Sequence, residues 1–364
     1  MNSVHLHQKL VKHLQTIGLR IGKVQRENLA LWCQALAVSP NCHLATLALR
    51  VPRLGRRENL VQRLRRFLKN EQVVAQACCR PVFAHLFSHW YGREVCLVMD
   101  RTDIEDRWSI LTVGAAYRHR LLPLAWKVLP FGGTSELEQI ALLRQVQAYL
   151  PSLEQVRVYV YGDCEFRAVA VQQVCRTNHW HWQVGVKSDT YFRQGQGAWQ
   201  TLQSLGVRPG QRLYLQDIYL TRKHDFGPVN LMADWSANQA YARYWTLDLP
   251  ATPQAWRRGR KRFWIEPTFR DWKSYGFDLE RSKIDDPYRL NELVLGIVLT
   301  TLWMIHIGDW LTDHGHHLDL IPATKNDYSL FRLGRDHVQR CLTMGWSIPV
   351  GFTVSHGQAP PHQF

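Results

Sequence analysis

EVCLVMD (residues 94–100), WSILTVGAAYRH (108–119) and LLPLAWKVLP (121–130) are three apolar runs that follow one another and decide the fold. Each run is short and rich in aliphatic and aromatic residues, a pattern typical of strands. Arg118 to Arg120 mark a tight turn between the second run and the third. We therefore predict three consecutive antiparallel strands.

The chain then alternates between helical and strand patterns. A helix is predicted at about 134–149, because Ser135 can cap its first turn. Its expected apolar stripe consists of Leu137, Ile140, Leu143 and Val146. VRVYVYGD (156–163) predicts a buried strand, and a second helix at about 165–177 and the strand WHWQVGVKS (180–188) follow.

The resulting order, β-β-β-α-β-α-β, resembles that of the ribonuclease-H-like fold. We therefore predict an α/β protein with a ribonuclease-H-like mixed-sheet catalytic domain. Helical periodicity before the first strand and β-prone runs after the last one predict two further parts. The predicted parts are an all-helical N-terminal domain (1–90), for which the basic charge described below favours DNA binding, the first part of the core (91–187), a β-rich insertion (188–255), the final helices of the core (256–311) and a C-terminal tail (312–364).

Three carboxylates are candidates for chemistry. Asp100 and Asp163 close two of the apolar runs, and Glu266 lies in RKRFWIEPTFRDWK (260–273). Each could instead be structural, as a strand-end residue, a turn residue or the partner of a nearby arginine. Their order along the predicted fold favours a shared site for divalent ions, because Mg²⁺ prefers hard oxygen ligands. The neighbouring carboxylates that could be mistaken for ligands are Asp103, Asp106, Glu165 and Asp271.

The chain is strongly basic, with 45 Lys and Arg against 30 Asp and Glu and a formal net charge of +15. Residues 1–95 alone hold 15 basic and 4 acidic residues, a balance of +11. This asymmetry favours a polyanionic partner, nucleic acid or an anionic membrane surface, over a small acidic substrate. In RRENLVQRLRRFLKN (56–70), Arg63, Arg66 and Lys69 could contact phosphates; the alternative is an ordinary amphipathic surface helix.

Two features bear on where the protein works. The eight cysteines form no C-x2-C pair, and the start MNSVHLHQKLVKHL lacks the apolar core of a signal peptide. The run at 293–307 is shorter than the roughly 20 residues that cross a bilayer, so it predicts a buried core helix. We expect a cytoplasmic, nucleoid-associated protein with reduced thiols and no membrane partner.

The motifs DRTD around Asp100, GDCEF around Asp163 and R-x3-E-x6-K around Glu266 resemble those of insertion-sequence family four DDE transposases. The resemblance runs over most of the chain, from the helical start to the C-terminal tail. It implies cut-and-paste DNA transposition, with the three carboxylates as metal ligands and with Arg262 and Lys273 contacting the transposon end. It also implies a hairpin intermediate and a homodimer when synapsed on DNA.

Two positions depart from the family pattern. The tyrosine of the family signature would fall at Gly259, so its role at the cleaved DNA end does not transfer to this chain. Pro267 directly follows Glu266 and removes a helical N–H. We therefore expect a helix to start or kink there, and Arg262 to reach the site by a different path.

The chemistry can be argued from the residues. Phosphodiester cleavage needs an activated water or 3′-hydroxyl and neutralised phosphate charge, and two Mg²⁺ ions about 3.5–4 Å apart supply both. We predict that Asp100 bridges both ions, that Asp163 and Glu266 each complete one coordination sphere, and that Mn²⁺ can substitute. The residues expected to hold flanking phosphates are Arg260, Lys261, Arg262 and Lys273.

Three functions fit these features. A Mg-dependent transposase would cleave double-stranded DNA at the element's terminal inverted repeats and join the 3′-hydroxyl to target DNA. A ribonuclease-H-like nuclease would cut without joining. An inactive transposase-derived protein would only bind DNA, and the intact carboxylate set argues against it. We predict the first.

Overall fold

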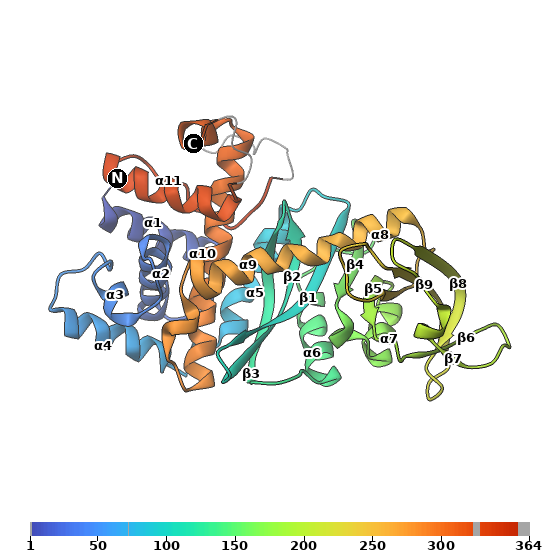
Figure 1. The fold of residues 1–364 in the computed structure, drawn as a ribbon. Helices are drawn as coiled ribbons and strands as arrows, with labels where there is room; N and C mark the ends of the chain where they lie inside the picture. The colour runs from blue at the N-terminus through green and yellow to red at the C-terminus, as the bar shows by residue number, and fades with distance from the viewer. Residues whose placement is uncertain (1, 72, 323–327, 356–364) are drawn as a thin grey trace.

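The computed structural model describes residues 2–71, 73–322 and 328–355 (Figure 1). Helices gather at one end of the molecule, and a sheet extends from them to the opposite end. Within the described residues the sheet has ten strands, in the order β3-β2-β1-β4-β5-β10-β9-β8-β6-β7.

The first five strands have the connections of the predicted core. They are β1 (Glu94–Ile104), β2 (Trp108–Tyr117), β3 (Arg120–Pro130), β4 (Arg157–Gly162) and β5 (His181–Val186). β1, β2 and β3 form an antiparallel meander, whereas β4 runs parallel to both β1 and β5. Helix α6 (Glu136–Gln147) leads into β4, and α7 (Val169–Thr177) leads into β5. The predicted order and the ribonuclease-H-like fold class are confirmed.

Helix α6 begins at its predicted start signal. Ser135 accepts a hydrogen bond from the Glu138 N–H, and the Glu138 side chain bonds back to the Ser135 backbone, which forms a capping box. The predicted stripe is buried except for Leu137, which is 75% exposed. That assignment was wrong because Leu137 lies nine residues before Val146, about two and a half helical turns, and so faces the opposite side.

Strand β1 is longer than the sequence pattern predicts. The prediction ended it at Asp100, but pairing with β2 continues to Ile104, with Asp100 opposite Thr112. The apolar run stops at Met99 because the other neighbour, β4, ends at Gly162 opposite Met99. Beyond that point β1 is paired on one side, and polar residues are tolerated there.

The predicted strand-rich insertion is present. Its strands are β6 (Tyr191–Gln194), β7 (Gln200–Thr201), β8 (Arg212–Leu220), β9 (Phe226–Asp234) and β10 (Arg243–Leu247). β10 pairs antiparallel with β5, so the insertion continues the core sheet instead of forming a separate one. The domain boundaries drawn from the sequence stay a prediction.

The N-terminal part is helical, as predicted. It consists of α1 (Ser3–Thr16), α2 (Lys23–Val38), α3 (Leu44–Ala48), α4 (Arg57–Leu68) and α5 (Ala75–Ser88). Its buried side chains belong to the same apolar cluster as those of the sheet. The helical end and the core sheet therefore share one hydrophobic core.

Helix α10 (Pro287–Asp313) lies at the centre of this shared core and packs against α2, β3 and the C-terminal helix α11 (Leu330–Met344). By length and composition alone it could cross a membrane, but 89% of its most apolar 18-residue window is buried inside the fold. The run at 293–307 is thus a buried core helix, as predicted.

Glu292 is one of two acidic residues buried in α10, and the other, Asp309, pairs with Arg118 at 2.7 Å. It is 1% exposed, and neither carboxylate oxygen has a hydrogen-bond partner within the described residues. Burial raises the pKa of Glu292 to about 7 from its usual 4.5, although the Asn291 amide and the Ala75 N–H lie near enough to oppose the shift. The folded state therefore binds this proton more tightly than the unfolded state does. The stability linked to Glu292 is fully present below pH 4.5 and is lost as the pH rises through 7.

We predict that Glu292→Gln raises the free energy of unfolding by about 2 kcal/mol at pH 8, because it removes the buried charge. At pH 5 the gain should largely disappear, since the wild-type carboxyl is then protonated. Urea denaturation at both pH values measures the effect, with the exposed Glu154→Gln as the matched control. A gain of equal size at both pH values would contradict the assignment.

Candidate active site

Two carboxylates meet where the parallel strands β1 and β4 run side by side. The strand register pairs Met99 with Gly162, so the residues that follow them, Asp100 and Asp163, lie next to each other. Asp163 is the first residue after β4 and caps a short 3-10 helix, where it accepts a hydrogen bond of 2.8 Å from the Glu165 N–H. The structure thus brings together two of the three predicted ligands.

The surroundings of Asp100 disfavour its charged form. Burial first, and then the charge of Asp163, raise the pKa of Asp100 to about 7, and Glu266 adds a smaller contribution. Arg262, with a nitrogen 3.8 Å from the carboxylate, and the Arg101 N–H at 2.8 Å act in the opposite direction. Two acids with such mutual repulsion are typical of a functional site that a cation would stabilise.

The third carboxylate, Glu266, lies on a helical run that crosses the sheet (Figure 1). The run consists of α8 (Pro253–Gly259), the 3-10 segment η3 (Arg260–Ile265), α9 (Glu266–Arg270) and the π-helical turn η4 (Asp271–Tyr275). η3 packs against strands β1 to β4, and the Glu266 side chain is exposed.

Pro267 explains why the run changes type at Glu266. The Glu266 N–H donates to the Phe263 carbonyl, three residues back, and Pro267 has no N–H to offer. The α-helical geometry resumes at Glu266, where the sequence predicted a helix start or kink.

Gly259 stands where the family signature has tyrosine, and the structure shows what occupies that space. A Cβ atom at residue 259 would lie 2.0 Å from the Gln183 amide nitrogen on β5. A side chain there would require Gln183 to move. The glycine lets the helical run lie close against the sheet.

The four residues of this run that were predicted to hold phosphates have different partners. Arg262 adjoins Asp100, and the Lys261 ammonium donates to the Cys96 thiol sulfur at 3.3 Å. The Arg260 guanidinium lies 5.8 Å from the centre of the Trp256 ring. The Lys273 ammonium pairs with a Glu280 oxygen at 2.8 Å. Arg262 is thus the predicted phosphate contact that the structure places beside the carboxylates.

The basic residues predicted to contact phosphates on or next to α4 differ in burial and in hydrogen bonding. Arg63 is half-buried and donates to the Asn28 side-chain oxygen at 2.7 Å, which ties α4 to α2. Arg66 is exposed, and Lys69 is exposed just beyond the end of the helix at Leu68. A phosphate contact by Arg63, Arg66 or Lys69 stays a prediction, and Arg63 in addition links α4 to α2.

Within the described residues, no three His, Cys, Asp or Glu side chains lie close enough together to hold a metal ion. The chemistry of the donors nevertheless fits a hard divalent cation: Asp100 and Asp163 supply neighbouring carboxylates, and burial, followed by the repulsion from Asp163, raises the pKa of Asp100. That Glu266 completes the site stays a prediction.

An ion pair that the sequence did not reveal holds the segments beside both aspartates. Arg101 donates to Glu165 at 2.8 Å, and the second Glu165 oxygen accepts from the Thr134 N–H at 2.8 Å and its hydroxyl at 2.6 Å. We call this pair the Arg101–Glu165 clamp. Arg101 follows Asp100 directly and Glu165 lies two residues after Asp163, so the clamp connects the two candidate ligand segments. The opposite charges of Arg101 and Glu165 are visible in the sequence, but their pairing depends on the β1–β4 register, which the sequence does not show.

The other neighbouring carboxylates are placed differently from the candidate ligands. Asp103 accepts a hydrogen bond of 2.6 Å from the Ser109 hydroxyl. Asp271 lies 3.4 Å from Arg120, and burial raises its pKa to about 6. Asp106 is exposed in the turn between β1 and β2. None of these three joins the Asp100 and Asp163 pair within the contacts that the structure describes.

The chain is similar in sequence to a known protein family. The family model for the transposase DDE domain matches residues 96–303, more than half of the chain. No curated protein matches the sequence. Among solved structures, a piggyBac transposase synaptic complex with hairpin DNA is similar, with 9% sequence identity and a TM-score of 0.46 over 91% of this chain and 76% of that one.

We predict that Glu165→Gln lowers the free energy of unfolding by about 2 kcal/mol, because it removes a charge-assisted hydrogen bond while keeping the side-chain size. Urea denaturation measures the loss, and Glu154→Gln is the exposed control. A double-mutant cycle with Arg101→Met isolates the clamp. Strictly additive losses would show that the two residues act independently.

Proposed function

We propose that this chain, which belongs to the transposase DDE domain family, cleaves DNA at the ends of an insertion sequence and transfers the strand to target DNA. The observation that carries the proposal is that Asp100 on β1 lies next to Asp163, which directly follows the parallel strand β4, beside Arg262 and the helical run of Glu266. The R-x3-E-x6-K spacing supports the narrower assignment to insertion-sequence family four.

In this proposal Asp100, Asp163 and Glu266 hold divalent metal, with two Mg²⁺ ions as the expected complement. Bound Mg²⁺ supplies an activated oxygen nucleophile and neutralises charge on the phosphate. Asp100 and Asp163 are pre-positioned by backbone N–H donors, each at 2.8 Å, so little reordering is needed for them to bind. Arg262 supplies positive charge beside the pair, where a phosphate would approach.

The proposed partner is double-stranded DNA, both the terminal inverted repeats of the element and the target. Residues 1–95 carry 15 basic and 4 acidic residues, and Arg66 and Lys69 present exposed charge there. Such a basic region attracts DNA through its phosphates, with strong salt dependence. We also propose that the protein forms a homodimer on synapsed DNA and that it is associated with the nucleoid. A hairpin intermediate would need a group other than residue 259 at the cleaved end.

We predict that Asp100→Asn, Asp163→Asn and Glu266→Gln each reduce DNA cleavage by about 10³-fold or more, since each removes a ligand worth several kcal/mol in the transition state. The substrate is a labelled duplex that carries the inverted repeat flanking the gene, with Mg²⁺ or Mn²⁺. The exposed Asp106→Asn is the matched control and should cleave as the wild type does. Binding of the duplex, measured by gel shift, should persist in all four variants.

The products of the same reaction decide between the candidate functions. Cleavage followed by joining to a target plasmid supports the transposase. Cleavage without joining would indicate a nuclease, and specific binding without cleavage would indicate a DNA-binding relic.

A metal-binding measurement tests the ligand set without a DNA substrate. We predict that Mn²⁺ binds the wild-type protein, as followed by electron paramagnetic resonance, and that binding weakens at least about tenfold in Asp100→Asn and Asp163→Asn, because each loses one anionic oxygen ligand. The Asp106→Asn variant should bind Mn²⁺ as tightly as the wild type. Equal Mn²⁺ binding by all of these proteins would contradict the assignment.

A further inference from the structure

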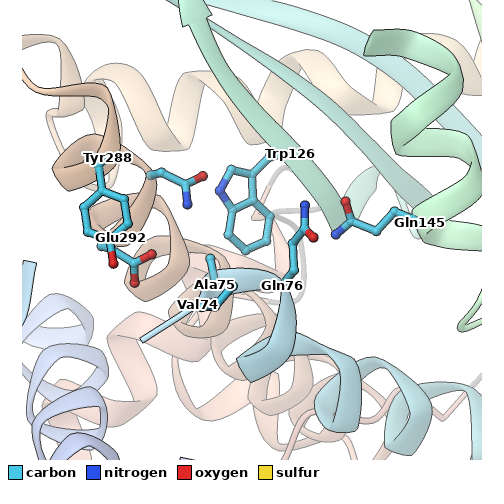
Figure 2. Close-up of a pocket in the computed structure, with 8 residues that line it drawn as sticks. Val74, Ala75, Gln76, Trp126, Gln145, Tyr288 and Glu292 are labelled. Carbon is cyan, nitrogen blue, oxygen red and sulfur yellow. The ribbon is translucent and has the colours of Figure 1, made fainter. Parts of the chain in front are cut away.

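Glu292 borders a cavity of about 260 Å³ that lies where α5, β3, α6 and α10 meet (Figure 2). Its walls come from elements that are far apart in the sequence. The residues on which the argument depends are Ala75, Gln76, Trp126, Gln145, Tyr288 and Glu292. None of them belongs to the proposed DNA-cleaving site, so the inference stands apart from the proposed function.

Two buried polar groups border this cavity, and neither makes a hydrogen bond of normal geometry in the described part of the chain, although the Asn291 amide and the Ala75 N–H lie near the Glu292 carboxylate. One is the carboxylate of Glu292, which is 1% exposed, and the other is the indole N–H of Trp126, which is 5% exposed. Figure 2 shows the Glu292 carboxylate below the Tyr288 ring and the Trp126 indole across from them. A native fold rarely leaves two such groups unsatisfied at one place.

The residues that line the cavity favour a positively charged ligand. The burial of the Glu292 carboxylate, which Asn291 and Ala75 offset only in part, costs free energy that a cation at hydrogen-bonding distance would recover. The rings of Trp126 and Tyr288 add aromatic walls, and aromatic faces attract organic cations. Tyr288 is held in place because its hydroxyl donates to the carbonyls of Asn70 and Val73, at 3.0 and 3.2 Å.

The cavity has an opening. A wider groove of about 740 Å³ shares part of its wall with the cavity. The shared residues are Gln76, Trp126, Gln145, Tyr288 and Asn291. A ligand can therefore enter past the exposed Gln76 and reach Glu292 at the inner end. Since a cavity of about 150 Å³ accommodates benzene, this one has room for a small aromatic amine.

We infer that this cavity is a binding site for a small organic cation, whose ammonium group pairs with Glu292 while its apolar body packs between Trp126 and Tyr288. The structure assigns the charge recognition to Glu292 and the shape recognition to the two rings.

Calorimetric titration of the full-length protein with benzylammonium chloride, in the absence of DNA, tests the site. The expected result is saturable binding with a Kd of about 1 mM or tighter. Glu292→Gln should weaken it at least about tenfold, because the amide oxygen can still accept a hydrogen bond but the ion pair with the carboxylate is lost. Benzyl alcohol, which keeps the shape without the charge, should bind wild type and Glu292→Gln alike and weakly.

Two further variants keep the test decisive. Gln76→Trp alters an exposed position at the opening, leaves Glu292 intact and should block binding; Glu154→Gln is a remote acidic control and should bind as the wild type does. Thermal unfolding by circular dichroism verifies that each variant is folded. Absence of saturable binding to the wild type, or equal binding by wild type and Glu292→Gln, would overturn the inference and leave a cavity that holds only water.

Discussion

The burial of α10 on all sides is the constraint on which the rest of the structure depends. A largely apolar helix of 27 residues cannot face water without a large cost, and here α2, β3 and α11 cover it. Parts that lie at opposite ends of the chain are thereby joined in one core. The hydroxyls of Thr300 and Thr301 donate to carbonyls four residues back within α10, at 2.7 and 2.8 Å, so these polar groups are buried without loss of hydrogen bonding.

The same helix positions the candidate active site. The indole N–H of the buried Trp272 donates to the Thr301 hydroxyl at 3.1 Å, which ties the helical run of Glu266 to α10. One turn earlier, the Thr268 hydroxyl accepts from the Leu121 N–H of β3 at 3.0 Å. Glu266 is exposed, yet the run that bears it is fixed at two buried points. The sheet fixes Asp100 and Asp163, and α10 fixes the run that faces them.

Patterns that are local in the sequence predicted the fold well. Apolar runs and one capping signal gave the order of the core strands and helix α6, since such signals act over a few residues. The clamp between Arg101 and Glu165 could not be predicted, because it depends on which residues of β1 and β4 are opposite each other. The end of β1 was predicted too early for a related reason. The change from apolar to polar residues at Asp100 marks the point where the neighbouring strand β4 ends, whereas β1 itself continues.

The contact between Arg262 and Asp100 links the expected binding positions of the two partners that the proposed function requires, DNA and a divalent metal ion. With a nitrogen–oxygen distance of 3.8 Å, the arginine partly offsets the negative charge of the aspartate. A phosphate that attracts Arg262 would remove this compensation and increase the affinity of Asp100 for a cation. By reciprocity, a cation at Asp100 would release Arg262 for the phosphate. DNA and metal would therefore bind cooperatively through one side chain, so that the charge of the site is balanced when the substrate is in place.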